Sequence, residues 1–413
     1  MTIKCRDVAK IPLLRAILVT CLLTGSTLAQ SEVGAIFLLI SPSATLNGLG
    51  QIGAAYPTDD IFGMYFNPAN FPELPTGFSA RYSFLTRTPW LENLADDMRL
   101  RCQGGQLGFR KRDWFLEANL GGYRTYLDLG KQIRTNEYGE EIGTFHSYMF
   151  ANVLVYGIRM SLGKERLAVR LALGGASKTA VQDLGPDGQG EMWRSEDKLT
   201  DFGFMAELPV TVQLDEAYGS LRFRPMLGYS VSNYGEAIRY PHDLKPDPPP
   251  TMARLGYSLT ISALSKSGRG TLLSVGFGRE VDDLLITFNS EHTDWETDMP
   301  LGDIDIEQHL IKGEPGPQVT LHEGQEVTIL DFVSLRVGKY TDISGKLEFS
   351  TRGFGISGKP LLRFFLGSFR HPIARFLTQQ VDIRYNESEE EGSLRGGTTY
   401  HSISFIIGDF GPK

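Results

Sequence analysis

Two places in the sequence put a histidine beside a serine, the pair of side chains that many hydrolases use. His146-Ser147 and His401-Ser402 would supply a base and a hydroxyl nucleophile if both side chains reached one point. Both pairs lie where apolar and polar residues alternate, and neighbours on a strand point to opposite faces. The chain contains no G-x-S-x-G, H-E-x-x-H or phosphate-binding glycine loop. We therefore assign no catalytic residue, and a lipid hydrolase is the remote alternative.

An acidic stretch near residue 300 is the second candidate for chemistry. Asp303, Asp305 and Glu307 would share one face of an extended chain, and the same loop carries Asp294, Glu296 and Asp298. Oxygen-rich clusters of this kind bind calcium. Their spacing does not match the twelve-residue calcium loop, so a solvated acidic loop is the favoured interpretation. We predict neither a metal nor a cofactor.

The first 29 residues resemble a cleaved secretory signal peptide. A basic start precedes an apolar run at 16–23, and small residues stand at Thr27 and Ala29. The run is too short for a membrane-spanning helix, which needs about 20 residues; an anchor, or a lipoprotein cut before Cys21, is the alternative. Cleavage after Ala29 removes four basic residues and one acidic residue, which changes the net charge from −8 to −11. An acidic chain gives no support for nucleic-acid binding.

Cleavage would also remove Cys5 and Cys21, leaving Cys102 without an intrachain partner. Disulfides therefore cannot hold this fold. We expect Cys102 to be a small apolar residue, either buried or facing lipid.

From residue 77 onward the chain alternates apolar and polar residues, the pattern of strands with two different faces. In residues 201–214, for example, Phe202, Phe204 and Ala206 share one face, and Asp201 and Glu207 share the other. A soluble sandwich and an outer-membrane barrel both give this pattern. The strands are long, as a tilted membrane crossing requires, and their polar face carries Arg and Glu beside Gly and Ser. These features favour a closed transmembrane barrel.

We count fourteen candidate antiparallel strands and therefore predict an all-β fold with a fourteen-stranded barrel over residues 77–413. The strands are 77–88, 98–110, 113–127, 144–162, 166–179, 199–214, 219–234, 252–265, 270–281, 284–291, 326–341, 345–357, 378–387 and 397–410. The tenth, 284–291, has the weakest pattern. The connections 128–143, 180–198, 235–251, 292–325 and 388–396 are long and polar, so they are expected to face outward, while short turns face the periplasm.

The segment before the barrel is apolar but has no regular period. Its sequence, residues 35–71, contains Phe37-Leu38, Gly53-Ala54-Ala55, Thr58-Asp59-Asp60 and Asn67-Pro68-Ala69. This order of motifs resembles the amino-terminal segment of the FadL superfamily of outer-membrane transporters, and it is closest to the PorV/PorQ branch. Ile52 stands where those proteins usually have a first glycine, and Thr58 where they have alanine.

The resemblance implies that residues 30–76 fold back into the barrel as a hatch that plugs the lumen. A lumen plug must pack apolar side chains without becoming a strand, and Pro68 interrupts the run. The alternative is an ordinary lead-in to the first strand. The residues assigned to the hatch and lumen-binding surface are Ile61, Phe62, Tyr65, Phe66, Asn67, Pro68, Ala69 and Phe71. Asn67 is expected to bind backbone groups that the irregular chain leaves unpaired.

Two functions follow from the resemblance, both in the outer membrane of a Gram-negative cell. In the first, the barrel moves a hydrophobic small molecule, and Gly121-Gly122 is the candidate strand kink for lateral exit into lipid. In the second, the barrel is a PorV-like component of type IX secretion that binds secreted proteins through its extracellular loops. The expected partners are therefore the lipid bilayer and either a hydrophobic molecule or a secreted protein.

Residues 359–380 stand apart from the strand pattern. Leu362, Phe365, Phe369, Ile373 and Phe376 recur at helical spacing, with Arg363, Arg370 and Arg375 among them. This pattern is typical of a short helix at a membrane interface. A strand with a turn at His371-Pro372 is the alternative.

Overall fold

In the computed structural model the fold begins at Val33. The described residues are 33–74, 76–90, 97–111, 115–136, 138–164, 167–186, 190–214, 219–241, 246–265, 270–289, 294–369, 371–391 and 397–408. The predicted signal peptide, residues 1–29, lies outside them.

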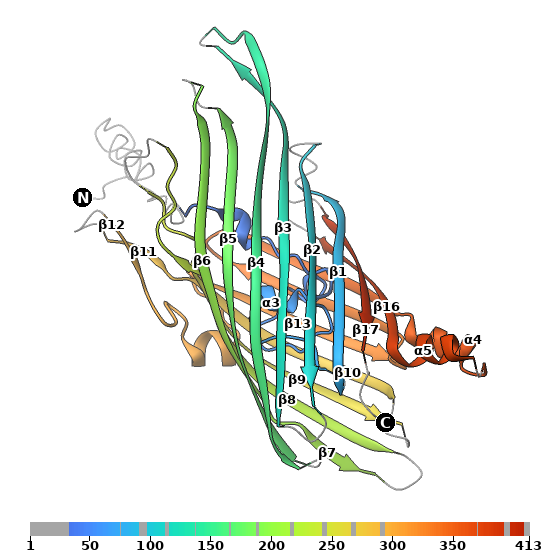
Figure 1. Cartoon of the computed structure of the whole chain (residues 1–413). Coiled ribbons are helices and arrows are strands. Elements are labelled where there is room, and N and C mark those ends of the chain that lie inside the picture. The colour runs from blue at the N-terminus through green and yellow to red at the C-terminus, as the bar shows by residue number, and fades with distance from the viewer. Residues whose placement is uncertain are drawn as a thin grey trace, which may run out of the picture. The chain divides into compact units, whose positions relative to one another are not determined.

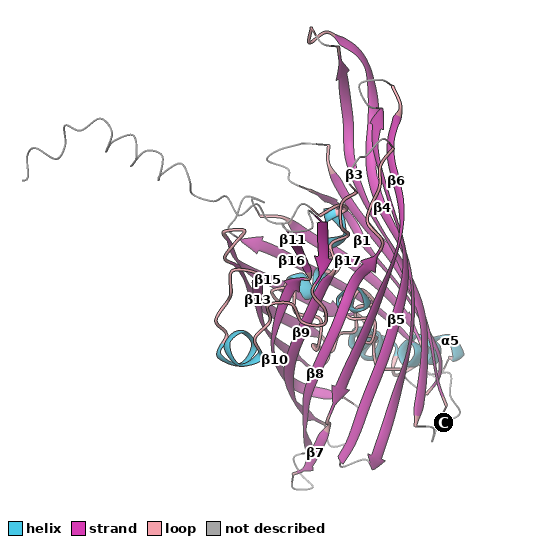
Figure 2. Ribbon diagram, turned by 90° about the vertical axis from the view of Figure 1, so that its left-hand side faces the viewer, coloured by secondary structure: helices cyan, strands magenta, loops and turns pink. Residues whose placement is uncertain are grey.

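Antiparallel strands form the wall of the fold (Figures 1 and 2). They are β1 (Gly77–Pro89), β2 (Arg99–Arg110), β3 (Leu116–Thr135), β4 (Glu141–Lys164), β5 (Leu167–Pro186), β6 (Met192–Glu207), β7 (Val210–Gln213), β8 (Ser220–Gly235), β9 (Met252–Leu264), β10 (Thr271–Leu284), β13 (Val319–Ile329), β14 (Val333–Asp342), β15 (Leu347–Ser357), β16 (Val381–Glu391) and β17 (Thr399–Ile407).

The sheet closes on itself, which confirms the predicted barrel. The first strand pairs with the last, from Ala80 opposite Ile407 to Leu85 opposite Ser402. Strands β6 and β7 both pair with β5 and β8, so they share one position in the wall. Pro209 lies between them and has no N–H to donate. The fifteen strands of the sheet therefore fill fourteen positions.

The predicted count of fourteen is right, but two of the predicted strands are wrong. Residues 284–291 are not a wall strand; they contribute β11 (Ile286–Asn289), which pairs only with β12 (Asp294–Thr297). The predicted strand 326–341 is instead parts of β13 and β14, which turn at Leu330 and Asp331. Both turn residues have positive φ, 57° and 51°. Glycine and asparagine usually mark such turns, and neither stands at these two positions.

The wall strands β3 to β6 are longer than predicted. Strand β3 continues to Thr135 and β4 begins at Glu141, so the expected long loop 128–143 is mostly paired strand. The same is true of 180–198, where β5 reaches Pro186 and β6 begins at Met192. These extensions carry polar residues on both faces, which hid their pairing from the alternation pattern. Figure 1 shows them rising beyond the other strands.

Residues 33–74, which we call the amino-terminal segment, run among the strands and contain three short helices. These are η2 (Ile36–Leu39), α2 (Ala44–Asn47) and α3 (Gly63–Phe66). A π-helix, η3 (Ile306–Lys312), lies in the connection between β10 and β13. Two further helices, α4 (Lys359–Leu366) and α5 (Pro372–Gln380), join β15 to β16. Among the described residues, no helix has the length and apolar character needed to cross a bilayer.

Candidate functional site

The amino-terminal segment runs among the strands (Figures 1 and 2). It packs against inward-facing side chains of the wall. Ile61, Phe62, Phe66 and Phe71 are at most 2% exposed, and Tyr65 is also buried. The ring of Phe62 meets that of Tyr123 of β3 edge-on, with centroids 6.2 Å apart. Burying each of these side chains stabilises the segment by roughly 1.5–3 kcal/mol. The segment is therefore held in place although most of it has no regular secondary structure.

Asn67 connects the segment to two wall strands. Its Nδ2 donates to the carbonyl oxygens of Ala54 at 2.7 Å, Phe204 of β6 at 3.1 Å and Tyr229 of β8 at 3.3 Å. Its Oδ1 accepts from the backbone N–H of Ala69 at 2.9 Å, which fixes the bend at Pro68. Two of these partners, the Ala54 carbonyl and the Ala69 N–H, are backbone groups of the irregular segment; a role for this amide in a lumen hatch stays a prediction.

Three further groups that the sequence did not indicate hold the irregular backbone. Asn70 donates from Nδ2 to the carbonyl oxygens of Gly53 and Tyr56, at 2.7 and 2.8 Å. Glu280 of β10 accepts from the N–H groups of Gly53 and Ala54, both at 2.6 Å. Ser230 of β8 donates to the carbonyl oxygen of Phe66 at 2.7 Å. A buried backbone group without a partner is costly, so these side chains replace the bonds that a strand would supply.

Glycines on the inner face of the wall let the segment's backbone approach closely. A Cβ on Gly203 would meet Asn67 and Pro68, and one on Gly174 would meet the backbone of Pro68 and Ala69. Gly228, Gly338 and Gly353 face the backbone at residues 54–55, 49–50 and 48 in the same way. Glycine inside a strand often marks such an approach. This signal was present in the sequence but was missed.

Ion pairs join the segment to the wall at the end where the short turns lie. The carboxylate of Asp59 pairs with Arg384 of β16 at 2.5 Å and with Arg81 of β1 at 3.5 Å. These guanidinium groups, Arg384 above all, hold the pKa of Asp59 below its usual value. Glu73 pairs with Arg170 of β5 at 3.1 Å. A polar cavity of about 430 Å³ lies beside Asp59, between the segment and β13 to β16.

The lumen therefore has two unlike halves. Toward the long connections, one part of the lumen wall is apolar; this part, which we call the upper lumen, comprises Leu85, Leu100, Cys102, Leu127, Ala151, Leu199 and Tyr400. The rest of that half carries buried ion pairs, among them Lys178 with Asp201 and Arg254 with Asp282. Toward the short turns, the inward residues are charged; this lower lumen comprises Arg110, Glu117, Arg159, Arg170, Glu207, Arg224, Glu326, Arg336, Asp382 and Arg384. Cys102 is buried in the upper lumen, which is the first of the two positions expected for it, buried or facing lipid.

The outer face of the wall is apolar over a continuous band. Exposed side chains in this band include Phe78, Leu107, Leu120, Leu154, Tyr156, Phe202, Leu227, Leu259, Val275, Leu335, Val337 and Phe405. A closed barrel with apolar residues outside and charged residues inside matches the solvent reversal that lipid imposes. The barrel spans a membrane.

No protein-family model and no curated protein matches the chain. Among solved structures, the CymD monoaromatic hydrocarbon channel is similar at 12% identity over 90% of this chain and 98% of its own, with a TM-score of 0.42. A Pseudomonas aeruginosa FadL homologue has 11% identity, coverage of 89% and 98%, and a TM-score of 0.38. The Ralstonia pickettii toluene transporter TbuX is similar at 10% identity over 89% of this chain and 97% of its own, with a TM-score of 0.41. Likeness at this level decides neither family nor substrate, and the resemblance to the PorV/PorQ branch stays a prediction.

The proposed strand kink at Gly121-Gly122 is not present. β2 pairs with β3, and β3 with β4, without a register shift through both glycines; on the β4 side the first irregularity follows Asp128. Gly121 faces Met64 of the segment, whereas Gly122 faces outward. Lateral exit at this pair requires a broken ladder, so we do not propose it.

The other chemical candidates are separated or differently folded. Ser147 and Ser402 are buried inside, whereas His146 is exposed and His401 contacts Tyr385 at 2.8 Å on the outer face. Neither pair brings base and nucleophile together. Asp303, Asp305 and Glu307 do not alternate along a strand, because η3 begins at Ile306 and Asp305 caps it by accepting from Gln308 N–H at 2.8 Å.

Residues 359–380 form helices, so the strand alternative for this stretch is wrong. Pro372 begins α5 rather than breaking a single helix, and Arg363 donates from α4 to the carbonyl oxygen of Thr378 in α5 at 3.3 Å. Phe364, Phe365, Phe369 and Ile373 are all more than 60% exposed. Arg370 lies outside the described residues. Figure 1 shows this pair of helices extending away from the wall near β16 and β17.

Proposed function

We propose that this protein moves a hydrophobic small molecule across the outer membrane through a lumen closed by the amino-terminal segment. The observation that carries the proposal is the apolar upper lumen. The interior of an outer-membrane barrel is usually polar, yet Leu85, Leu100 and Leu127 face inward here. A hydrophobic compound entering from the side of the long connections gains roughly 25 cal/mol for each Å² of apolar surface removed from water.

In this proposal the hatch is the segment over residues 30–76. Phe37, Leu38, Ile61 and Phe62 occupy the upper lumen and are buried there. A bound hydrophobic molecule would take the place of these side chains against the same wall. Ligand binding and hatch displacement are therefore linked, because each occupies the space of the other.

The lower lumen is the least favourable part of the path for a hydrophobic molecule. Its charged side chains do not solvate an apolar molecule, and the cavity beside Asp59 is lined by Arg336, Asp382 and Arg384. The ion pairs of Asp59 hold the segment at this point. We infer that the segment must loosen its contacts with β16 and β1 before the compound reaches the periplasm.

A fatty acid carrying a diazirine, photolysed in outer membranes that contain the protein, tests this function. We expect cross-links to the upper lumen and to Phe62, and we expect excess unlabelled fatty acid to suppress them. Cross-links to Leu120 and Phe202, which face lipid, should persist under the same competition. Cross-links confined to the outer face, or lumen cross-links that competitor leaves unchanged, would contradict the proposal.

A matched pair of variants sharpens this experiment. Leu127 and Leu120 lie on the same strand, buried inside and exposed outside respectively. Leu127→Gln should weaken competable labelling of the lumen about tenfold, since burying an amide beside a hydrophobic ligand costs over 1 kcal/mol. Leu120→Gln should leave that labelling unchanged.

A second candidate function rests on the connection 285–318. Met299, Ile306 and Ile311 are exposed there, and the connection is held to the wall by Arg279, which donates to the carbonyl oxygen of Ile311 at 2.8 Å. A fixed apolar patch outside the barrel suits binding of exported proteins in the PorV-like manner. Co-purification of secreted proteins that is lost in Ile306→Ser with Ile311→Ser, but retained in Leu127→Gln, would support this candidate over transport.

A further inference from the structure

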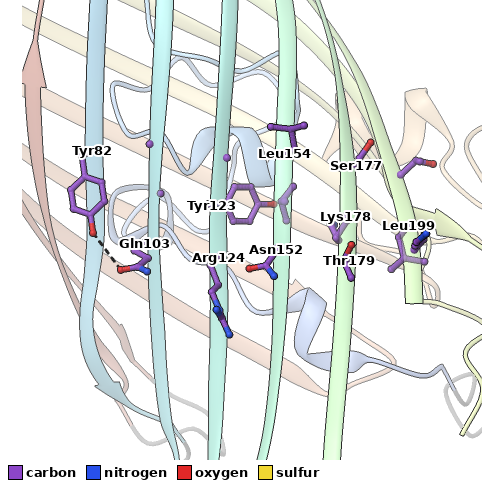
Figure 3. A pocket seen from close by; sticks show the side chains of 16 residues that line it. Tyr82, Gln103, Tyr123, Arg124, Asn152, Leu154, Ser177, Lys178, Thr179 and Leu199 are labelled. Atoms are coloured by element: carbon purple, nitrogen blue, oxygen red, sulfur yellow. Dashed lines mark hydrogen bonds between the residues drawn. The ribbon is translucent and has the colours of Figure 1, made fainter. Parts of the chain in front are cut away.

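A groove of about 890 Å³ crosses the outer surface of the wall from β1 to β6 (Figure 3). Two parallel rows of outward residues line it, each formed by direct cross-strand partners. The row nearer the short turns, which we call the lower row and which Figure 3 draws above the other, is Tyr82, Gly105, Gly122, Leu154, Ser177 and Thr200. The upper row is Gln103, Arg124, Asn152, Thr179 and Lys198.

The lower row gives the groove its floor. Gly105 and Gly122 are register partners, so no side chain rises from the wall at their position. Tyr82 and Leu154 stand on either side of this gap and are about half exposed. The surface between them has the width and apolar sides that an extended acyl chain needs.

The upper row is polar and carries a positive charge near each end. The strand spacing of about 4.8 Å puts the backbones of Arg124 on β3 and Lys198 on β6 about 14 Å apart. Gln103, Asn152 and Thr179 supply amide and hydroxyl groups beside and between them. The guanidinium carbon of Arg124 lies 4.3 Å from the ring centre of Phe150, which holds the cation against the wall.

These two cations lack the carboxylate partner that several other outer-face cations have. Elsewhere, Arg279 pairs with Glu323 at 2.6 Å, Lys339 pairs with Glu348 at 2.6 Å, and Arg352 pairs with Glu391. Within the described part of the chain, Arg124 and Lys198 make no ion pair. Their positive charge is therefore available to a ligand.

The groove lies at the border of the apolar band. On β4, the outward residues from Leu162 to Leu154 are apolar, and the next outward residue is Asn152. Nine residues match one tilted crossing of the hydrocarbon layer. The upper row therefore sits at headgroup level, on the side of the long connections.

We propose that this groove binds a phosphorylated glycolipid of the outer leaflet. Arg124 and Lys198 bind its phosphates, the amides and hydroxyls between them bind its sugar hydroxyls, and an acyl chain lies over Gly105 and Gly122. This assignment rests on the proposed outer-membrane location but not on transport through the lumen. Arg binds phosphate by paired N–H donors, and Lys binds it as a point charge. Each cation can therefore bind one phosphate, and both phosphates contribute to the affinity.

Native mass spectrometry of the purified full-length barrel with diphosphorylated lipid A tests the proposal. The double variant R124Q/K198Q should bind this lipid at least tenfold more weakly than the wild type. The control R352Q/K339Q removes the same charge on another part of the outer wall, and it should bind like the wild type. Dephosphorylated lipid A should bind the wild type no better than it binds R124Q/K198Q.

A second variant tests the floor without changing charge. Gly105→Phe fills the gap between Tyr82 and Gly122, and we expect it to weaken binding of diphosphorylated lipid A as well. Heat-modified migration on gels checks that each variant is folded. Equal binding by wild type and R124Q/K198Q, or undiminished binding of dephosphorylated lipid, overturns the proposal. Lumen cross-linking by the fatty-acid probe reports on transport separately, so the two proposals fail independently.

Discussion

Asn67 of the amino-terminal segment donates a hydrogen bond of 3.1 Å to the carbonyl oxygen of Phe204, a backbone group near the end of strand β6. The same amide also reaches Tyr229 of β8. One side chain thus holds a proline-interrupted segment to two neighbouring strands. These carbonyl oxygens lie where water is excluded. Removing the amide therefore takes away a donor that water cannot replace.

Asn67→Leu should loosen the segment while keeping a side chain of similar size. Loss of a buried donor costs about 1–3 kcal/mol, so we expect a lower free energy of unfolding and larger ion conductance in planar bilayers. Asn136→Leu is the control, because the side chain of Asn136 makes its described hydrogen bonds within its own turn, to Tyr138 and Glu140. Equal conductance in both variants would show that Asn67 does not secure the segment.

Gly203→Ala tests the close approach of segment and wall. Its Cβ would meet Asn67 Oδ1 and lie 3.0 Å from Pro68 Cδ, and such overpacking typically costs about 1–3 kcal/mol. Gly105→Ala adds the same methyl group on the outer face, where the nearest atom is the carbonyl oxygen of Arg81 at 3.4 Å. We expect urea unfolding to shift for Gly203→Ala alone. A shift of equal size for Gly105→Ala would mean that the strands, and not the segment, resist the methyl group.

The ion pairs of Asp59 predict a pH dependence with a definite sign. Arg384 and Arg81 lower the pKa of Asp59 in the folded protein below the ordinary value of an aspartate. The stabilisation is therefore complete above about pH 4 and is lost as the pH falls through the lowered pKa. Stability from this pair should be constant from pH 5 to 8.

Asp59→Asn should remove that acid-sensitive part at every pH. The Asp59 side chain is 48% exposed, so we expect a loss of about 1 kcal/mol or less at pH 7. Urea unfolding measures the free energy of unfolding at pH 7, where the contribution of this pair is complete, and at pH 3, where it is reduced. A wild type and a variant that differ more at pH 3 than at pH 7 would exclude this role for Asp59.

The helices α4 and α5 should lie in lipid at the periplasmic interface. Phe364 is 79% exposed in the chain by itself, and burying such a ring is worth roughly 1.5–3 kcal/mol. A fluorescent label on Phe364→Cys should be quenched by brominated lipid in nanodiscs, whereas a label on Lys346→Cys, in the turn between β14 and β15, should not. Cys102 is buried and should not react. Absence of quenching at residue 364 would place the helices in water or against a partner protein.

The sequence by itself determined the closed barrel, whereas its count of fourteen strands came out right because the false strand 284–291 offset the merging of β13 and β14 into one. Alternation is enforced locally, because each strand must present one face to lipid and the other to the lumen, and this pattern survives in residues 77–110 and 199–264 without reference to their neighbours. The use of Asn67 also followed from sequence, since an irregular buried backbone needs polar side chains. The positions of β11, β13 and β14 did not, because a turn at Leu330 and Asp331 has no compositional signal.

Only the tertiary structure decided which residues meet inside the wall and on its surface. Asp59 finds Arg384 across more than 300 positions of sequence, and Gly203 faces Asn67, because closing the sheet brings strands of opposite ends together. The row from Gln103 to Lys198 likewise exists only through the register of five strands. Register depends on pairing energies summed over whole strands, which no short stretch of sequence contains.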